Sequence, residues 1–241
     1  MVSIRSNGST PATEFWAGSR AIVPLVIGAA PFGILFGALA IEAKLSVLAT
    51  IAMSAIVFAG SAQFIVLGLL TSGTPLPIIL LTTAILNLRH LLYALSLLPH
   101  VRSLSGAWRL ILGFWLTDEA FAVAIARYHQ PDSSPYKHWY YLGAALLMYL
   151  NWQLCTWIGI GLGQQLPKAA SHRLEFAMSV TLIGMIVPYL TTISMGGAVI
   201  VAGVAALLTQ SFPHQSGLIV SAIAGVMAGS TIEQTMRRGH S

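Results

Sequence analysis

The chain has 241 residues, of which 56% are hydrophobic and only 8% are charged. A soluble domain carries about 25% charged residues, so this composition excludes a soluble globular protein and indicates one that lies within a lipid bilayer. The formal net charge is +5, but the basic residues are scattered at the ends of apolar segments without forming a tract, which argues against a nucleic-acid partner.

The two ends of the chain are polar and frame one long apolar region. Residues 1–19 predict a flexible N-terminal tail, and residues 237–241 a short basic tail. The first apolar run starts after Arg20 and continues for about twenty residues, longer than the core of a secretory signal, so we expect a retained helix. No connection is long enough for a soluble domain, which predicts a single transmembrane permease domain over 20–236.

Eight apolar segments follow one another within this region. They cover approximately 20–41, 47–70, 76–98, 108–128, 139–163, 174–191, 193–209 and 217–235. A helix needs about 20 apolar residues to cross a bilayer. The polar break at Thr191 and Thr192 is short, and Pro188 can instead kink one longer helix, so seven and eight spans both remain open. The predicted fold class is an all-α polytopic integral membrane protein with seven or eight transmembrane helices, in either orientation.

The third segment carries Asn87, Arg89 and His90 close to its centre. A charge at the midplane of a bilayer costs about 2.5–3.5 kcal/mol even on the lenient insertion scale. We therefore expect Arg89 to have a partner. Asn87 and His90 share one face of this helix, and Arg89 shares the other with Tyr93, since successive residues are about 100° apart. We assign the Arg89 face to the functional site.

Polar or helix-breaking residues stand at the same depth in five consecutive segments. Besides the third segment, these residues are Pro31 with Phe32 and Gly33, then Gly60, Ser61 and Gln63, then Asp118 and Glu119, and finally Asn151 and Gln153. Broken backbone and polar side chains are tolerated at that depth where they line a polar cavity. The pattern predicts such a cavity, with some helices broken near the midplane.

The third and fourth segments are joined by a short loop, so Arg89 is expected to meet Asp118 or Glu119. If His90 is neutral, one carboxylate is left over and can take up a proton. The same residues also fit a structural ion pair that fixes helix register. For the other positions, close packing at Gly60 and interhelical hydrogen bonds from Asn151 and Gln153 are the plainer interpretations.

Residues 87–93, Asn-Leu-Arg-His-Leu-Leu-Tyr, resemble the signature of the AzlC family of branched-chain amino acid permeases. Four further stretches are similar in the same order, namely Pro31-Phe32-Gly33 with Gly37, 58–64 (Phe-Ala-Gly-Ser-Ala-Gln-Phe), 117–121 (Thr-Asp-Glu-Ala-Phe) and 174–177 (Leu-Glu-Phe-Ala). The resemblance implies a bacterial inner (plasma) membrane permease that exports valine, leucine, isoleucine and similar amino acids. It also implies a small second membrane subunit of the AzlD type.

The mechanism expected from these residues is secondary active export driven by protons. Arg89 is expected to bind the substrate carboxylate, aided by free N–H groups of a helix broken at Pro31 or near Gly60. Asp118 is expected to bind the ammonium group, while Glu119 or His90 carries the proton. The expected substrate-binding residues are Arg89, Asp118, Asn87, Pro31, Phe32, Gly33, Gly60, Ser61 and Gln63. Phe32, Phe58 and Phe64 are candidates for the apolar pocket.

Several other functions lack their motifs in the sequence. There is no Gly-Lys-Ser or Gly-Lys-Thr phosphate loop, and neither His-Glu-x-x-His nor Gly-x-Ser-x-Gly occurs, so we expect neither ATP-driven transport nor an enzyme. The single cysteine, Cys155, excludes a cysteine metal cluster, and no cofactor is expected. A channel, or a transporter of another small solute, remains the alternative, although a channel favours rings of like charge.

Overall fold

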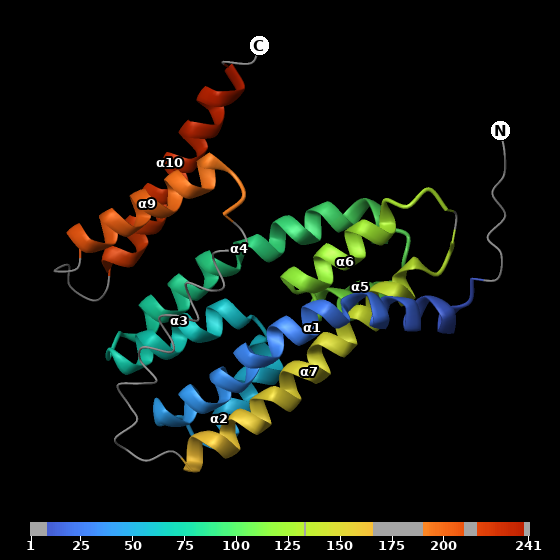
Figure 1. Ribbon diagram of the computed structural model, residues 1–241, viewed down its shortest axis with the longest axis horizontal. Helices are drawn as coiled ribbons and strands as arrows, with labels where there is room; N and C mark the ends of the chain where they lie inside the picture. The colour runs from blue at the N-terminus through green and yellow to red at the C-terminus, as the bar shows by residue number, and fades with distance from the viewer. Residues whose placement is uncertain (1–8, 133, 166–189, 210–215, 239–241) are drawn as a thin grey trace. The chain divides into compact units, whose positions relative to one another are not determined.

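The computed structural model describes residues 9–132, 134–165, 190–209 and 216–238, which are almost wholly helical and contain no strand (Figure 1). The chain divides into two compact units. The first comprises Met1–Gln63 with Leu86–Ser171, and the second Phe64–Ile85 with His172–Ser241. Most of the predicted segment 174–191, including the motif at 174–177, lies outside the described residues.

Three helices are long and apolar enough to cross a membrane: α1 (Pro11–Glu42), α4 (Leu76–Val101) and α7 (Lys137–Gln165). They confirm the predicted all-α polytopic membrane class. Residues 11–19, which composition assigned to a flexible tail, belong to α1. The helix starts early because Thr10 and Thr13 form a capping box and Pro11 occupies the first turn, where a missing N–H costs nothing.

Helices α1 and α7 are packed side by side and run in the same direction. The hydroxyl of Ser19 donates to the carbonyl of Gly143 (3.1 Å), and the amide of Asn151 donates to the carbonyl of Val26 (3.3 Å). Further along both helices, a Cβ atom on Gly33 would lie only 2.7 Å from that of Cys155. Because the contacting residues follow one another in the same order along both helices, the helices are parallel. The hydrogen bond from Asn151 to α1 confirms its expected interhelical role.

The first helix is not broken. Helix α1 continues through both Pro24 and Pro31, and Pro31 itself is exposed. A proline inside a helix removes one hydrogen bond, but packing against a neighbouring helix can keep the helix continuous. Here the glycine-lined contact with α7 supplies that packing. Of the two predicted helix breaks, only the one near Gly60 is present.

The segment 106–128 forms two short helices, α5 (Gly106–Phe114) and α6 (Asp118–Tyr128). Trp108 near the start of α5 contacts Trp139 at the start of α7, with ring centroids 5.0 Å apart. Tyr128 at the end of α6 stacks on His100 at the end of α4, at 4.8 Å. Since α4 leads into α5 and α6 leads into α7, both ends of the segment lie at the same end of this unit.

A straight helix from 108 to 128 would separate its ends by about 30 Å, at about 1.5 Å per residue. The segment that the sequence predicted as a fourth span is instead a helical hairpin, folded back at residues 115–117 (Figure 1). Its arms share one apolar core with α4 and α7, made of Leu97, Leu112, Leu116, Ala120, Ala124, Tyr141 and Ala145. The fold-back has a local cause, because Thr117 caps α6 by accepting a hydrogen bond from the N–H of Ala120.

The segment after α1 also turns back. It consists of α2 (Val47–Ala52), the π-helical turn η1 (Met53–Val57) and α3 (Gly60–Thr71), with Phe58 in the left-handed region at φ 38°. The amide of Gln63 in α3 donates to the carbonyl of Met53 in η1 at 2.9 Å. A straight helix would place these two residues about 15 Å apart. The predicted second span is therefore interrupted and reversed at Phe58 and Ala59, so two of the predicted segments fold back.

In the second unit, α9 (Ile193–Leu208) and α10 (Ser216–Arg238) pack against each other through small residues. A Cβ atom on Gly225 would lie 2.8 Å from that of Ala202. Their bounds agree with the predicted segments 193–209 and 217–235 to within a few residues.

Candidate functional site

Arg89 lies halfway along α4 and contacts two helical hairpins, the first formed by α2, η1 and α3 and the second by α5 and α6. It connects their tips, the places where each chain segment turns back. Its Nη1 lies 2.8 Å from Oδ2 of Asp118, the first residue of α6. Its Nη2 donates to the hydroxyl of Ser61, in the first turn of α3, at 2.6 Å. The structure thus brings together three of the predicted site residues from three helices. The expected pairing of Arg89 with Asp118 is present.

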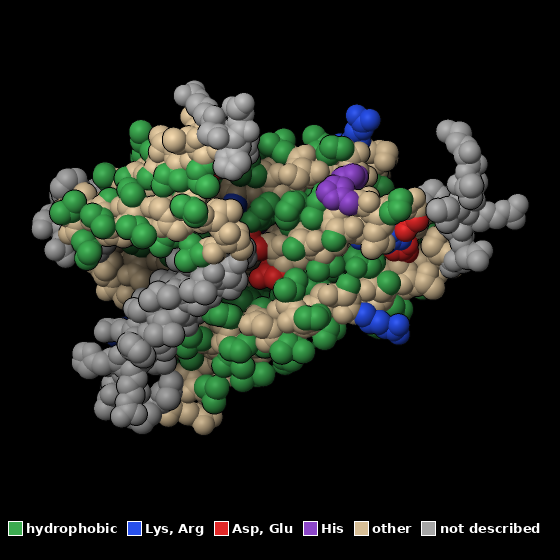
Figure 2. Space-filling view, turned by 45° about the horizontal axis from the view of Figure 1, so that its top comes forward, with side chains coloured by type: hydrophobic (Ala, Val, Ile, Leu, Met, Phe, Trp, Pro, Cys, Tyr) green, Lys and Arg blue, Asp and Glu red, His purple; other side chains and the backbone are tan. Residues whose placement is uncertain are grey.

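Both hairpins present the N-terminal end of their second helix at this point. The first turn of a helix has N–H groups without intrahelical partners and carries a partial positive charge. Arg89 adds a full positive charge, while Asp118 and Glu119 in the first turn of α6 offset it. Figure 2 shows acidic side chains interrupting an otherwise largely apolar face. The site therefore offers attraction to both signs of charge within a few residues.

Hydrogen bonding around the ion pair is incomplete. Among the described residues, several buried polar atoms on the hairpins and on the helices beside them have no hydrogen-bond partner. They include the donors Nε of Arg89 and Nε1 of Trp115 and Trp152, the acceptors Oδ1 of Asp118, Oδ1 of Asn87 and Oε1 of Gln63, and the hydroxyls of Thr82 and Tyr128. A buried polar atom without a partner costs about 1–3 kcal/mol. Unpaired donors and unpaired acceptors together indicate a site where a polar ligand or water supplies the missing hydrogen bonds.

Side chains of helix α7 hold the first hairpin tip by hydrogen bonds to the backbone carbonyls of η1. Gln153 donates to the carbonyl of Ser54 at 3.1 Å, and the hydroxyl of Tyr149 donates to the carbonyl of Ala55 at 3.2 Å. The hydroxyls of Ser54 and Thr156 are 2.9 Å apart. Together with Gln63, Gln153 and Tyr149 donate hydrogen bonds to three successive carbonyls of η1. Gln63 and Gln153 thus support the tip, in agreement with the interhelical role expected for Gln153.

The glycine and aromatic residues predicted near the first tip take different positions. Gly60 faces Trp152, whose ring would lie 3.0 Å from a Cβ atom at that position. Phe58 is buried and meets the ring of Tyr149 edge to face at 4.9 Å. Phe64 is fully buried. Close packing thus describes Gly60 well, and Phe64 has no exposed surface to offer a substrate.

Pro31, Phe32 and Gly33 are not joined to the ion pair by any contact recorded for the described residues. Pro31 is exposed, Phe32 is half-buried, and Gly33 is buried against α7. Gly33 lies beside Cys155 and Trp152, so it lets α1 and α7 approach closely. The part that the sequence assigned to these three residues in substrate binding stays a prediction.

The two candidates for proton coupling flank the ion pair. Glu119 follows Asp118 in the first turn of α6 and is half-buried. His90 follows Arg89 and meets the ring of Tyr93 edge to face at 5.9 Å, and Tyr93 in turn stacks on Phe121 of α6 at 4.5 Å. The face of α4 that carries Arg89 and Tyr93 therefore meets the second hairpin. Their roles in transport stay predictions.

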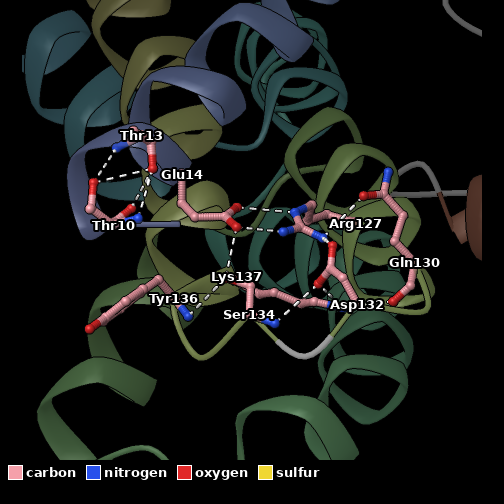
Figure 3. A network of polar contacts seen from close by, with 9 residues as sticks. All are labelled: Thr10, Thr13, Glu14, Arg127, Gln130, Asp132, Ser134, Tyr136 and Lys137. Atoms are coloured by element: carbon pink, nitrogen blue, oxygen red, sulfur yellow. Dashed lines mark hydrogen bonds and ion pairs between the residues drawn. The ribbon is translucent and has the colours of Figure 1, made fainter. Parts of the chain in front are cut away.

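A second charged cluster, absent from the sequence-based site, lies at the other end of α6 (Figure 3). Arg127 donates to both carboxylate oxygens of Glu14, with Nε 3.0 Å from Oε2, and it also pairs with Asp132. Ser134 donates to Glu14 at 2.8 Å, and Lys137 pairs with Asp132 at 3.2 Å. Glu14 belongs to α1, so the cluster fastens α1, the end of α6 and the start of α7 together.

Asp132 in this cluster has a strongly shifted pKa. Burial raises it, but hydrogen bonds from Arg127, the N–H of Ser134 and Lys137 outweigh that effect and lower the pKa to about 2. No local signal in the sequence pairs Glu14 with Arg127, because they are 113 positions apart. Among the described residues no group of three or more His, Cys, Asp or Glu side chains is arranged to hold a metal ion.

Comparison with known proteins places this arrangement among membrane proteins. A family model described as AzlC protein matches residues 24–166. The inner membrane protein YgaZ of Escherichia coli is 28% identical over 90% of this chain and 82% of its own length. The branched-chain amino acid transport protein AzlC of Bacillus subtilis is 29% identical over 71% of this chain and 67% of its own length. An uncharacterized membrane protein of Archaeoglobus fulgidus is 28% identical over 84% and 88%. No solved structure matches.

Proposed function

We propose, since the chain belongs to the AzlC protein family, that it is a secondary active exporter of branched-chain amino acids in a bacterial inner membrane. The proposal of substrate rests on the Bacillus subtilis relative, whose name states branched-chain amino acid transport. The proposal of an inner-membrane location is supported by the Escherichia coli relative. Valine, leucine and isoleucine are the expected substrates.

The observation that carries the proposal is the ion pair between Arg89 and Asp118 with unpaired polar atoms around it. An amino acid is a zwitterion, so it needs a cationic and an anionic partner a few ångströms apart. Arg89 and the N-terminal turn of α3 suit the carboxylate, and Asp118 suits the ammonium group. A zwitterion inserted between the two leaves the total charge of the site unchanged, which limits the electrostatic cost of binding.

Glu119 is the proposed carrier of the coupling proton, with His90 as the second candidate. Glu119 is the carboxylate left over once Arg89 is paired with Asp118, and it lies next to that pair in the first turn of α6. Movement of one elementary charge across 100 mV is worth about 2.3 kcal/mol. If Glu119 takes up one proton outside and releases it inside for each amino acid exported, the inward movement of that proton supplies the free energy for export.

The proposal includes a small second membrane subunit of the AzlD type, which rests on the family resemblance. Export is therefore to be measured with that subunit present and absent. Efflux that is the same without the subunit would remove this part of the proposal and leave the rest.

The test is efflux of labelled valine from loaded vesicles that contain the chain and the small subunit. We expect Arg89→Ala and Asp118→Asn to abolish efflux. Arg109→Ala, which removes an exposed arginine from α5, is the matched control and should leave efflux unchanged. Normal efflux in either site variant would contradict the assigned roles. Full activity after the proton gradient is collapsed would contradict proton coupling, and a panel of competing amino acids defines the substrate.

A further inference from the structure

Four aromatic residues link the two hairpin tips. The ring of Tyr149 on α7 lies 4.9 Å from that of Phe58 on the first tip, and 5.8 Å and 6.2 Å from those of Trp115 and Phe114 on the second. We refer to Phe58, Phe114, Trp115 and Tyr149 as the tip cluster. Tyr149 is the member that touches both hairpins, and it belongs to neither.

The Tyr149 ring is held in one orientation. Its hydroxyl donates to the carbonyl of Ala55 at 3.2 Å, and the edge-to-face contact with Phe58 has an interplanar angle of 79°. Because the hydroxyl is already used by the backbone, the part of Tyr149 that remains for a ligand is its apolar ring. Tyr149 and Trp115 are each only partly buried, so their rings retain accessible surface.

Two members of the tip cluster are close in sequence to residues that Arg89 contacts. Phe58 comes three residues before Ser61, and Trp115 three residues before Asp118. Ser61 and Asp118 are the two residues that Arg89 contacts. An amino acid whose charged groups bind at Arg89 and Asp118 therefore extends its side chain towards neighbouring aromatic rings.

We propose that Tyr149 is a specificity-determining residue, whose fixed ring packs against the aliphatic side chain of the transported amino acid, with Trp115 beside it. This inference rests on the proposed function and replaces two of the residues that the sequence suggested for the apolar pocket. Phe64 is fully buried, and no ring contact recorded for the described residues joins Phe32 to either hairpin tip, whereas Tyr149 contacts both.

A fixed aromatic surface selects substrates by shape. Under this proposal, a branched aliphatic side chain makes more contact with the ring than alanine does, and it needs less room than phenylalanine. The ring of Tyr149 offers no hydrogen bond to a hydroxyl on the substrate side chain, so serine and threonine are desolvated against it at a cost. One methylene in an apolar pocket changes selectivity by about 10–200-fold.

The experiment measures how well alanine, valine, leucine and phenylalanine each compete with labelled valine in vesicles containing the chain and the small subunit. We expect Tyr149→Ala to reduce the preference for leucine over alanine by about tenfold or more, and to make phenylalanine an effective competitor. We expect Tyr149→Phe, which keeps the ring, to retain the wild-type order. Trp157→Ala on the exposed side of α7 is the matched control and should change nothing.

An equal weakening of all four competitors in Tyr149→Ala would overturn the proposal, because it would mean that the ring only holds the tips together. Tyr149→Leu provides the same test if the alanine variant does not reach the membrane, with a shifted size preference again expected. A failure of the proposed function is distinguishable, since wild-type vesicles would then release no amino acid, and that result would overturn both proposals.

Discussion

Two arginines at opposite ends of α6 make contrasting sets of contacts. Arg127 pairs with Glu14 and Asp132, so that each nitrogen of its side chain has a hydrogen-bond partner. It also lies over the ring of Tyr140, 5.7 Å from the ring centroid. Its side chain is 10% exposed. Arg89 has one carboxylate and one hydroxyl as partners, keeps an unpaired Nε, and is 31% exposed.

The difference is between an arginine whose side-chain nitrogens all have partners and one that keeps an unpaired nitrogen. A buried charge stabilises a protein only when its hydrogen bonds are complete, as they are around the Arg127 side chain. An ion pair with unpaired atoms on both sides has capacity left for a ligand that brings one donor and one acceptor group. The comparison therefore supports a structural role for the Arg127 end of α6, and it agrees with our proposal that the Arg89 end binds the substrate.

The largest effect is expected from Arg89→Lys. Lysine keeps the charge but cannot bridge Asp118 and Ser61 with two separate N–H groups of a planar fork. We expect valine efflux to fall at least a hundredfold, while the melting temperature of the purified protein changes little. The measurement is efflux from vesicles together with thermal unfolding in detergent.

Arg109→Lys provides the matched control, since Arg109 is exposed on α5 and should tolerate the change in both assays. Efflux near the wild-type level in Arg89→Lys would place the substrate carboxylate elsewhere. A large loss of thermal stability would instead make Arg89 the structural arginine and break the comparison.

The next largest effect is expected from Glu14→Gln, which breaks the buried pair with Arg127. Loss of one partner from a buried ion pair costs about 3–5 kcal/mol, because the other charge is left uncompensated. We expect a clear fall in melting temperature, whereas the efflux per folded molecule, measured at low temperature, stays close to that of the wild type.

Thr13→Ser, in the same turn of α1, is a suitable control because it keeps the capping hydroxyl. An unchanged melting temperature in Glu14→Gln would show that this cluster does not hold the helices together.

The helices were predictable from sequence because their signals are local. Apolar runs located α1, α4 and α7, whereas the start of α6 at Asp118, capped by Thr117, lies in the middle of a segment that the sequence predicted as one span. The reversal of the chain at residues 115–117 was not predictable in the same way. An apolar segment of about twenty residues has the composition of a membrane span whether it crosses the membrane or turns back. The fold-back is recognised only from tertiary contacts, in which Trp108 meets the start of α7 and Tyr128 meets the end of α4.

The candidate site was predictable in part for the same reason. A midplane arginine needs a counter-charge, so Arg89 pointed to Asp118. Tyr149 gave no such signal, since an aromatic residue in an apolar helix is ordinary. Glu14 with Arg127 could not be paired either, because ion pairs between distant segments follow from the packing of α1 on α7 rather than from spacing.

A smaller effect on transport is expected from Ser61→Ala. The substitution removes the neutral acceptor of Arg89 at the first hairpin tip and leaves Asp118 in place. A net hydrogen bond to a charged group is worth about 1.5–3 kcal/mol, with the lower value appropriate to a partly exposed pair. We expect the KM for valine to rise about tenfold in initial-rate efflux measurements, with little change in melting temperature. An unchanged KM would mean that Arg89 positions the substrate through Asp118 alone.

The smallest effect is expected from Asp132→Asn at the Arg127 end. The pKa of Asp132 is about 2, below its ordinary value of 3.8, so the ionised carboxylate stabilises the folded protein above about pH 4, and this contribution is lost as the pH falls towards 2. The side chain is 36% exposed, so water and salt screen the pairing. The melting temperature is to be measured between pH 3 and 8. That of the wild type should exceed that of Asp132→Asn by a small, constant margin near neutral pH, and the margin should narrow in acid. A margin that widens in acid would mean that protonated Asp132 is the stabilising form. Valine efflux should not respond to this substitution, because Asp132 lies at the end of α6 remote from Asp118.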